Sequence, residues 1–253
     1  MRLKLISRGI AALVGVAAVA MSVNGCATQD SELFIRAVAD SPPGQCIVKP
    51  EADTQIRLVG TLDLAFGGPY YATLLWGNQL VERGSSDLVR TEVNRVALES
   101  ADVSVQLTDG SEITSYSVPT SGFADPTVGG LPGFGLAAVP LIDFKSGRAA
   151  YKAGKRTLVS KVRLFGKTLG GSSVQSNQFT YVVEVCNGCL VNYKAVNNDP
   201  TAATGSPNCL AALNSTAMAT SESAPCQLGH DYPIDCTLCL TSYQVCLTGP
   251  GAL

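Results

Sequence analysis

The chain has 253 residues, 46% of them hydrophobic, so it is long enough to bury one sizeable core. It carries 18 basic and 20 acidic residues, a formal net charge of −2, together with nine cysteines and a single histidine. This balance argues against a nucleic-acid-binding protein, because such a protein needs a basic surface to neutralise phosphates.

The N-terminus has the parts of a secretory signal peptide. Arg2, Lys4 and Arg8 supply positive charge, and residues 10–21 form an uninterrupted run of apolar or small side chains. A run of about 12 residues suits a signal sequence and is too short to span a bilayer core, which needs about 20. We therefore predict that residues 1–25 are removed. The basic count then falls from 18 to 15 against 20 acidic residues, a net charge of about −5.

The signal ends at residues 23–26 with the sequence VNGC, which resembles the lipobox of bacterial lipoproteins. The resemblance covers residues 1–26 and implies that Cys26 becomes a lipid-bearing N-terminus anchored in the cell envelope. Because Ala27 follows rather than aspartate, the resemblance further implies the outer membrane. The alternative is an ordinary signal cut near Ala20 or Gly25 that leaves Cys26 as a plain thiol.

Residues 26–45 are predicted to form a tether. The sequence SPPG at residues 41–44 interrupts regular structure, because proline lacks an amide donor and glycine permits unusual dihedral angles. The short apolar stretch at residues 33–38 suits either a first edge strand or one helical turn.

From residue 46 to residue 185 apolar and polar side chains alternate with a period of two. One predicted face carries Tyr70, Ala72, Leu74 and Trp76, and another carries Phe179, Tyr181, Val183 and Val185. About seven short strands at this spacing predict an all-β fold, an antiparallel β-sandwich, for which an immunoglobulin-like arrangement is the working hypothesis. Trp76 is expected in the core.

An irregular excursion is predicted at residues 119–135, which contain three prolines and five glycines. Its glycines do not fit a dinucleotide-binding motif, because Ala138 stands where the last glycine belongs. The segment is expected to be a connecting loop, with the alternative of a binding loop that exposes Leu131 and Phe134.

Residues 186–253 are predicted to form a cysteine-rich, mostly irregular region. It has two C-x2-C pairs, Cys186 with Cys189 and Cys236 with Cys239, which could hold zinc or act in redox chemistry. The predicted export to an oxidising compartment favours structural disulfides instead.

The number of cysteines supports this prediction. With Cys26 lipidated, eight cysteines remain, and Cys46 supplies the partner that the seven of the C-terminal region lack. Its disulfide is therefore expected to pin that region to the sandwich, although eight cysteines allow 105 pairings. The disulfide candidates are Cys46, Cys186, Cys189, Cys209, Cys226, Cys236, Cys239 and Cys246.

The single histidine, His230, has Asp231 and Asp235 nearby, yet no motif of an activated nucleophile accompanies it. It is expected to be an exposed loop residue. We therefore predict no catalytic residue, cofactor or metal.

The sequence thus predicts a lipid-anchored envelope protein that is not an enzyme and serves as a structural or interaction protein. The expected partners are the membrane, through the lipid on Cys26, and an envelope protein or glycan, with no nucleic acid. A carbohydrate- or ligand-binding module that uses residues 119–135, Tyr70 and Tyr71 is the alternative. A thiol oxidoreductase is a further alternative.

Overall fold

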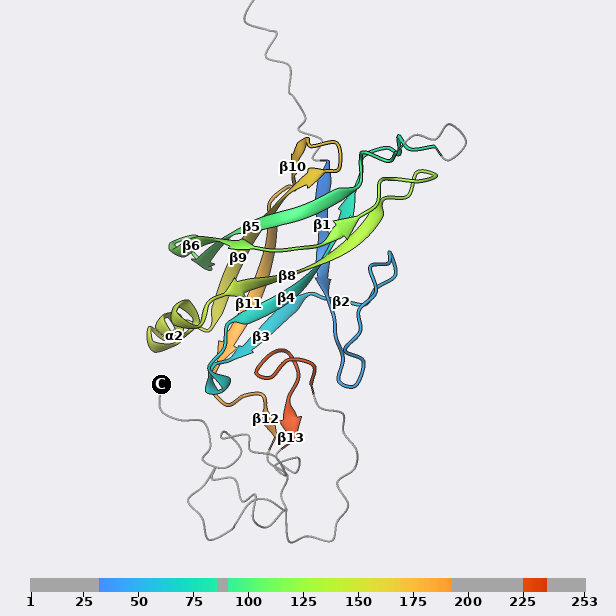
Figure 1. Ribbon diagram of the computed structural model, residues 1–253. Helices are drawn as coiled ribbons and strands as arrows, with labels where there is room; N and C mark the ends of the chain where they lie inside the picture. Colours follow the sequence, from blue (N-terminus) through green and yellow to red (C-terminus); the bar gives the residue numbers. More distant parts are fainter. Residues whose placement is uncertain (1–31, 86–90, 193–224, 236–253) are drawn as a thin grey trace, which may run out of the picture. The chain divides into compact units, whose positions relative to one another are not determined.

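The structure, a computed structural model, describes residues 32–85, 91–192 and 225–235 (Figure 1). These residues form two large β-sheets and one small one. The strands of sheet A are, in spatial order, β2 (Ile56–Arg57), β1 (Leu33–Ala39), β4 (Tyr70–Asn78) and β8 (Gly133–Ile142). All of the pairings in sheet A are antiparallel.

Sheet B is the larger of the two. Its main path runs β3 (Val59–Asp63), β11 (Phe179–Cys186), β9 (Thr157–Thr168), β5 (Val96–Leu107) and β6 (Glu112–Pro119). Two short strands complete it: β10 (Ser173–Gln175) beside β9 and β7 (Phe123–Ala124) beside β5. The pair β3–β11 is parallel, whereas the other pairs are antiparallel.

The order of six strands agrees with the immunoglobulin arrangement, although no described strand lies beside β8 in the place of strand D. When β1, β4, β5, β8, β9 and β11 are taken as strands A, B, C, E, F and G, sheet A holds A, B and E side by side. Sheet B then holds C, F and G, with β6 as the additional strand that pairs beside strand C. The predicted all-β sandwich is confirmed.

The core lies between the two sheets and follows from the alternation in the sequence. Tyr181, Val183 and Val185 of β11 are buried, whereas the residues between them are more exposed. Trp76 of β4 is fully buried, as predicted. Burial of each large aliphatic side chain contributes about 1.5–3 kcal/mol, so these inward faces are the main source of stability.

Strand β1 lies inside the range predicted as a tether. Its buried residues include Leu33 and Val38, and it pairs with β2 on one side and β4 on the other, so it is an internal strand rather than an edge. The register shifts between Ile35 and Ala37. This bulge breaks the strict alternation by which a strand is recognised in a sequence.

A helix that the sequence analysis did not predict, α2 (Phe144–Lys152), connects β8 to β9. Asp143 caps it by accepting a hydrogen bond from the Ser146 amide at 2.9 Å. The buried residues of the helix are small, and a Cβ atom on Gly147 would lie 3.2 Å from Leu64 in the 3₁₀ turn η1 (Leu64–Phe66). Small buried residues give no apolar pattern of helical period.

The described part of the cysteine-rich region adds the two-stranded parallel sheet of β12 (Val191–Asn192) and β13 (Ile234–Asp235). The side chain of Ile234 is buried. Between residues 225 and 233 the chain forms turns, in agreement with a mostly irregular region.

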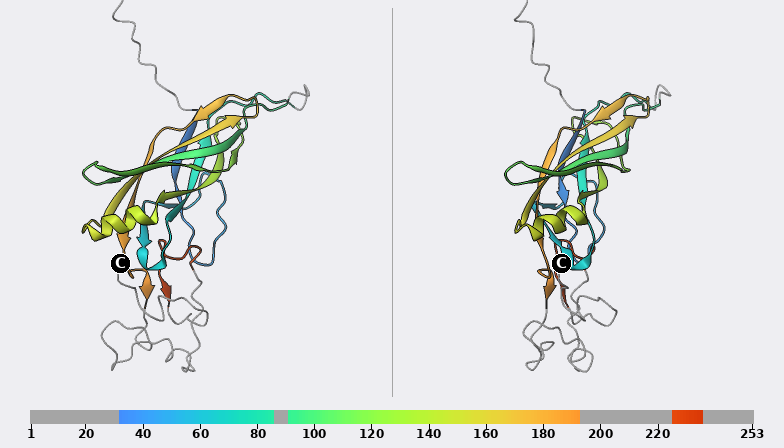
Figure 2. Two further views of the ribbon diagram at one scale, coloured as in Figure 1. Left: turned by 60° about the vertical axis from the view of Figure 1, so that its left-hand side comes forward. Right: turned by 90° about the vertical axis from the view of Figure 1, so that its left-hand side faces the viewer.

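We call the end of the sandwich where β1 begins the leading end. There Leu33 pairs with Asn78 and bridges to Ser176, which follows β10. Figure 2 shows that α2 lies toward the other end of the sandwich from the β9–β10 hairpin. The connections β4–β5 and β7–β8 also reach the leading end, because Asn78 at the end of β4 pairs with Gly133 at the start of β8.

Candidate functional site

The segment of residues 225–235 docks onto the outer edge of sheet B. The amide of Asp63 donates to the carbonyl of Gly229 at 2.8 Å, and the amide of Asp231 donates to the carbonyl of Thr61 at 3.0 Å. The Thr61 amide in turn donates to Oδ1 of Asp231 at 2.8 Å. The segment therefore satisfies backbone groups of β3 that an open sheet edge would leave unpaired.

A polar cluster of Tyr70, Asp231, Arg57 and Asp40 anchors this segment. The hydroxyl of Tyr70 donates to the carboxylate of Asp231, with oxygen–oxygen distances of 3.1 and 3.2 Å. Arg57 lies between the two carboxylates, with Nε 3.6 Å from Asp231 and Nη2 2.8 Å from Asp40. Tyr232 also donates to Asp40, at 2.7 Å. Every charged group of the cluster thus has a partner within the protein.

Burial determines the protonation of this cluster. It raises the pKa of Asp231, against the opposing effects of the Thr61 amide, Arg57 and Tyr70. It also raises the pKa of Tyr70 and raises the pKa of Tyr181 to about 12. Both phenols therefore stay protonated at neutral pH and act as hydrogen-bond donors.

The space beside the cluster is small. A cavity of about 30 Å³, lined by residues that include Tyr70, His230 and Asp231, leaves room for about one water molecule. The cluster therefore holds the segment in position.

His230 is buried, so the expectation of an exposed loop residue is wrong. Its side chain is 8% exposed, with Nδ1 2.6 Å from Oε1 of Gln227 and Nε2 2.7 Å from the carbonyl oxygen of Pro69. Burial lowers the pKa of His230, although the Pro69 carbonyl opposes that shift. Both ring nitrogens are used, so His230 is not free to act as a base.

Acid is expected to weaken the docking through His230. The pKa of His230 lies below its ordinary value of 6.5, so its contribution to stability is complete above that pH and is lost as the pH falls through the lowered pKa. Asp231, whose pKa is raised, acts in the opposite sense: its contribution is complete below pH 3.8 and is lost as the pH rises through the raised pKa.

Comparison of the wild type with the His230→Gln variant isolates the contribution of the histidine to the pH dependence of stability. The difference in thermal midpoint between the two proteins should shrink as the pH is lowered from about 7.5 to about 5. A difference that stays constant or grows over this range would contradict the argument.

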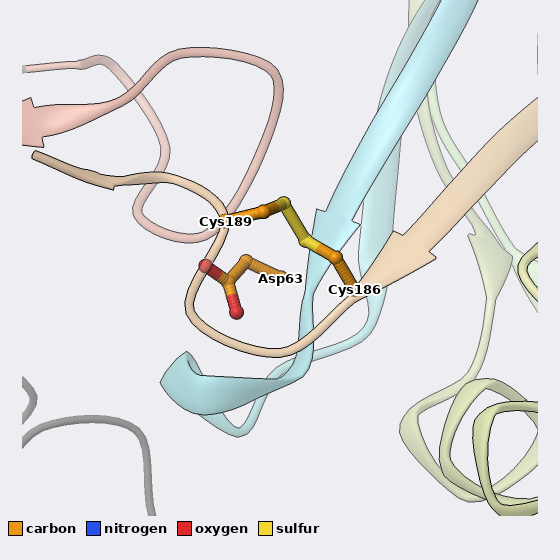
Figure 3. Close-up of side chains that lie close together, drawn as sticks. All are labelled: Asp63, Cys186 and Cys189. Carbon is orange, nitrogen blue, oxygen red and sulfur yellow. A yellow bond between two sulfur atoms is a disulfide. The ribbon is translucent and has the colours of Figure 1, made fainter. Parts of the chain in front are cut away.

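The first C-x2-C pair forms a disulfide beside a buried carboxylate (Figure 3). Cys186 and Cys189 are bonded to each other at the point where the chain leaves β11. Oδ1 of Asp63 accepts hydrogen bonds from the amides of Ala65 at 3.0 Å and Gly188 at 2.6 Å. Oδ2 accepts from the amide of Leu190 at 2.8 Å. Asp63 is fully buried and thus ties the turn of the disulfide to the end of β3.

Among the residues that the structure describes, Asp63, Cys186 and Cys189 also have the spacing of metal ligands. Their ligand atoms lie within 4.8 Å of one another. Both sulfur atoms are in the disulfide, however, so neither is the thiolate that a metal site requires. The carboxylate oxygens already accept three backbone hydrogen bonds. The arrangement is that of a structural lock on the turn.

The second disulfide joins Cys46 to Cys226 across a sequence separation of 180. It links the chain just after β1 to the docked segment, as expected for a bridge that pins the cysteine-rich region to the sandwich. The predicted lipid site Cys26 and the remaining cysteines Cys209, Cys236, Cys239 and Cys246 lie outside the described residues.

The residues proposed for a ligand-binding alternative do not gather into one site. Tyr70 is fully buried, so it offers no ring face to a ligand, whereas Tyr71 is exposed. A separate hollow of about 390 Å³ lies over β5, β6 and β9, where Lys161, Arg163 and Tyr116 are among its lining residues. The Tyr116 hydroxyl donates to the Pro140 carbonyl at 2.9 Å, so its polar group is already used.

Sequence reasoning missed Asp63, Arg57 and Asp231 as the residues that organise this region. No motif marks them, because each acts on backbone or side-chain groups far away in the sequence.

Among the described residues, no helix is long and apolar enough to cross a bilayer. A scan against known protein families finds no family that matches the chain, and a search of curated proteins finds no match either.

Proposed function

We propose that the chain is a lipid-anchored protein of the bacterial cell envelope. In this proposal its β-sandwich is a structural or interaction module without enzymatic activity. The observation that carries the proposal is the VNGC sequence at residues 23–26, directly after a signal-like apolar run. Strand β1 begins at Leu33, so the sandwich starts only seven residues after the proposed lipid site. A lipid on Cys26 would therefore hold the folded domain close to a membrane.

In this proposal the described residues around His230 have a structural role. His230 and the carboxylates around it are engaged in docking the segment of residues 225–235, and the adjoining cavity has room for about one water molecule. The proposed partners are the membrane and an envelope protein or glycan. The proposed location is the outer membrane, since Ala27 follows the lipid cysteine.

A thiol oxidoreductase has less support. Redox-active C-x2-C motifs are usual at a strand-to-helix junction, where the helix N-terminus lowers the thiol pKa. Here Cys186 ends β11 and the chain continues through the turn into β12, a strand. The geometry around Cys186 and Cys189 therefore lacks that source of activation.

The anchor is tested by labelling. Cells that are fed a labelled fatty acid should transfer the label to the wild-type protein and not to the Cys26→Ser variant, because only the thiol of Cys26 accepts the lipid. Cys46→Ser is the matched control and should be labelled like wild type. Equal labelling of the wild type and Cys26→Ser would contradict the proposal.

A further inference from the structure

Large apolar side chains are exposed at the leading end of the sandwich. Val81 is 70% exposed, Val128 is 58% exposed and Leu131 is 74% exposed. Phe123 and Leu169 are also exposed there. Soluble surfaces commonly expose single apolar residues, whereas several from different loops at one end indicate a contact surface.

The loops that carry these residues are joined by hydrogen bonds. Val81 forms a bridge with Thr127, and Val128 and Leu131 exchange two backbone hydrogen bonds of 3.1 Å. Asn94 donates to the Val81 carbonyl at 2.6 Å. Val81, near the start of the β4–β5 connection, and Val128 and Leu131, in the β7–β8 connection, are thus held in a fixed arrangement; we call these three side chains the apolar tips.

Close backbone packing supports this arrangement. A Cβ atom on Gly133 would come within 3.0 Å of the Asp125 carbonyl oxygen, and one on Gly135 would lie 2.5 Å from the Phe123 carbonyl oxygen. Glycine at both positions lets the start of β8 lie directly against residues 123–125. The glycine-rich sequence therefore allows close backbone packing next to Val128 and Leu131.

The position of the proposed lipid limits where this end can lie. Seven peptide steps separate Cys26 from Leu33, and a fully extended chain spans at most about 25 Å over that length. Strand β1 then runs away from the leading end, from its pairing with Asn78 at Leu33 to its pairing with Ile56 at Ala39. The leading end is consequently the end at which the chain enters the sandwich.

We propose that the apolar tips Val81, Val128 and Leu131 contact the surface of the bilayer in which Cys26 is anchored. This inference rests on the lipid anchor proposed above and adds an orientation to it. The domain stands with its leading end against the lipid, and the docked segment of residues 225–235 faces away from it. Apolar side chains at the membrane surface lower their free energy when they leave water for the boundary between headgroups and acyl chains.

The charges beside the tips indicate which lipid chemistry suits this end. The described charged side chains near the tips include four acidic ones, Glu32, Glu82, Glu92 and Asp125, and two basic ones, Arg83 and Arg95. Arg95 is paired with Asp125 at 3.1 Å. These described side chains form no basic cluster of the kind that recognises anionic headgroups. The contact is therefore apolar and should form on zwitterionic phosphatidylcholine.

The test measures tryptophan fluorescence, to which the one natural tryptophan contributes a constant emission. Trp76 is fully buried, so its emission should not respond to quenchers in a membrane. Lipidated Leu131→Trp protein is bound to phosphatidylcholine vesicles with or without brominated acyl chains. We expect bromination to cut the emission added by the new indole about twofold or more, because that indole sits at the headgroup boundary.

The matched control is Ile47→Trp, at a residue that is 88% exposed and lies beyond the far end of β1. Its added emission should be the same on brominated and unbrominated vesicles. Equal quenching at both positions, or none at Leu131→Trp, would overturn the proposed orientation.

Flotation of the same samples separates the two proposals. Protein that floats with the vesicles while the new indole at position 131 escapes quenching overturns the orientation and leaves the anchor standing. If the protein with an intact Cys26 is isolated from cells without a lipid and does not float, both proposals are overturned. Hydrogen exchange of the unsubstituted protein gives a second measurement: residues 125–132 should exchange more slowly on vesicles than in soluble Cys26→Ser protein.

Discussion

Replacing Asp63 by alanine is expected to destabilise the protein by about 3 kcal/mol, since each buried donor left without an acceptor costs about 1–3 kcal/mol. The substitution removes the acceptor for the amides of Ala65, Gly188 and Leu190 at a fully buried position. The turn of the Cys186–Cys189 disulfide would lose its attachment to β3. Urea unfolding, extrapolated to water, measures the loss.

Glu92 provides a matched control because it also accepts three backbone hydrogen bonds. Its donors are the amides of Arg83, Gly84 and Asn94, but the side chain is only partly buried. Water can replace the carboxylate there, so Glu92→Ala should cost about 1 kcal/mol or less. Similar losses in the two variants would show that burial does not decide the contribution of Asp63.

Removing the Cys46–Cys226 disulfide is expected to cost more than removing the Cys186–Cys189 disulfide. A cross-link stabilises a protein mainly by restricting the unfolded chain, and the effect grows with the length of the closed loop. The sequence separations are 180 and 3 residues. Loop-closure entropy then gives about 5 kcal/mol for the long loop and about 2 kcal/mol for the short one.

The experiment compares two double variants, Cys46→Ser/Cys226→Ser and Cys186→Ser/Cys189→Ser, so that no unpaired thiol of the pair remains to exchange. Denaturant unfolding of both under non-reducing conditions gives the two losses. The sandwich should stay folded in both, because its core lies in the paired sheets. A larger loss of stability for the short loop would show that the Cys186–Cys189 disulfide stabilises the protein by more than loop closure.

The β-sandwich could be predicted from the sequence because most strands bury one face. Tyr181, Val183 and Val185 alternate with more exposed residues, and burial in the structure follows that alternation. The prediction failed where local irregularity hides the pattern. β1 contains a register shift between Ile35 and Ala37, and α2 buries only small residues.

The candidate site could be predicted only in part. A bridge from Cys46 to the cysteine-rich region followed from the odd number of cysteines there, but the choice of Cys226 did not. Burial of His230 depends on the Pro69 carbonyl, and the role of Asp231 depends on Tyr70, 161 residues away along the chain. Such contacts cannot be predicted from the neighbouring residues in the sequence.

The sequence by itself determined the period-two pattern, the expected core position of Trp76, the lipobox-like VNGC and the surplus cysteine, because each depends on neighbouring residues or on a count. Only the tertiary structure decided the parallel pairing of β3 with β11, the Cys46–Cys226 bridge and the gathering of Val81, Val128 and Leu131 at one end. These features join segments distant along the chain, and their free energy comes from burial and hydrogen bonds that exist only once the sheets have packed.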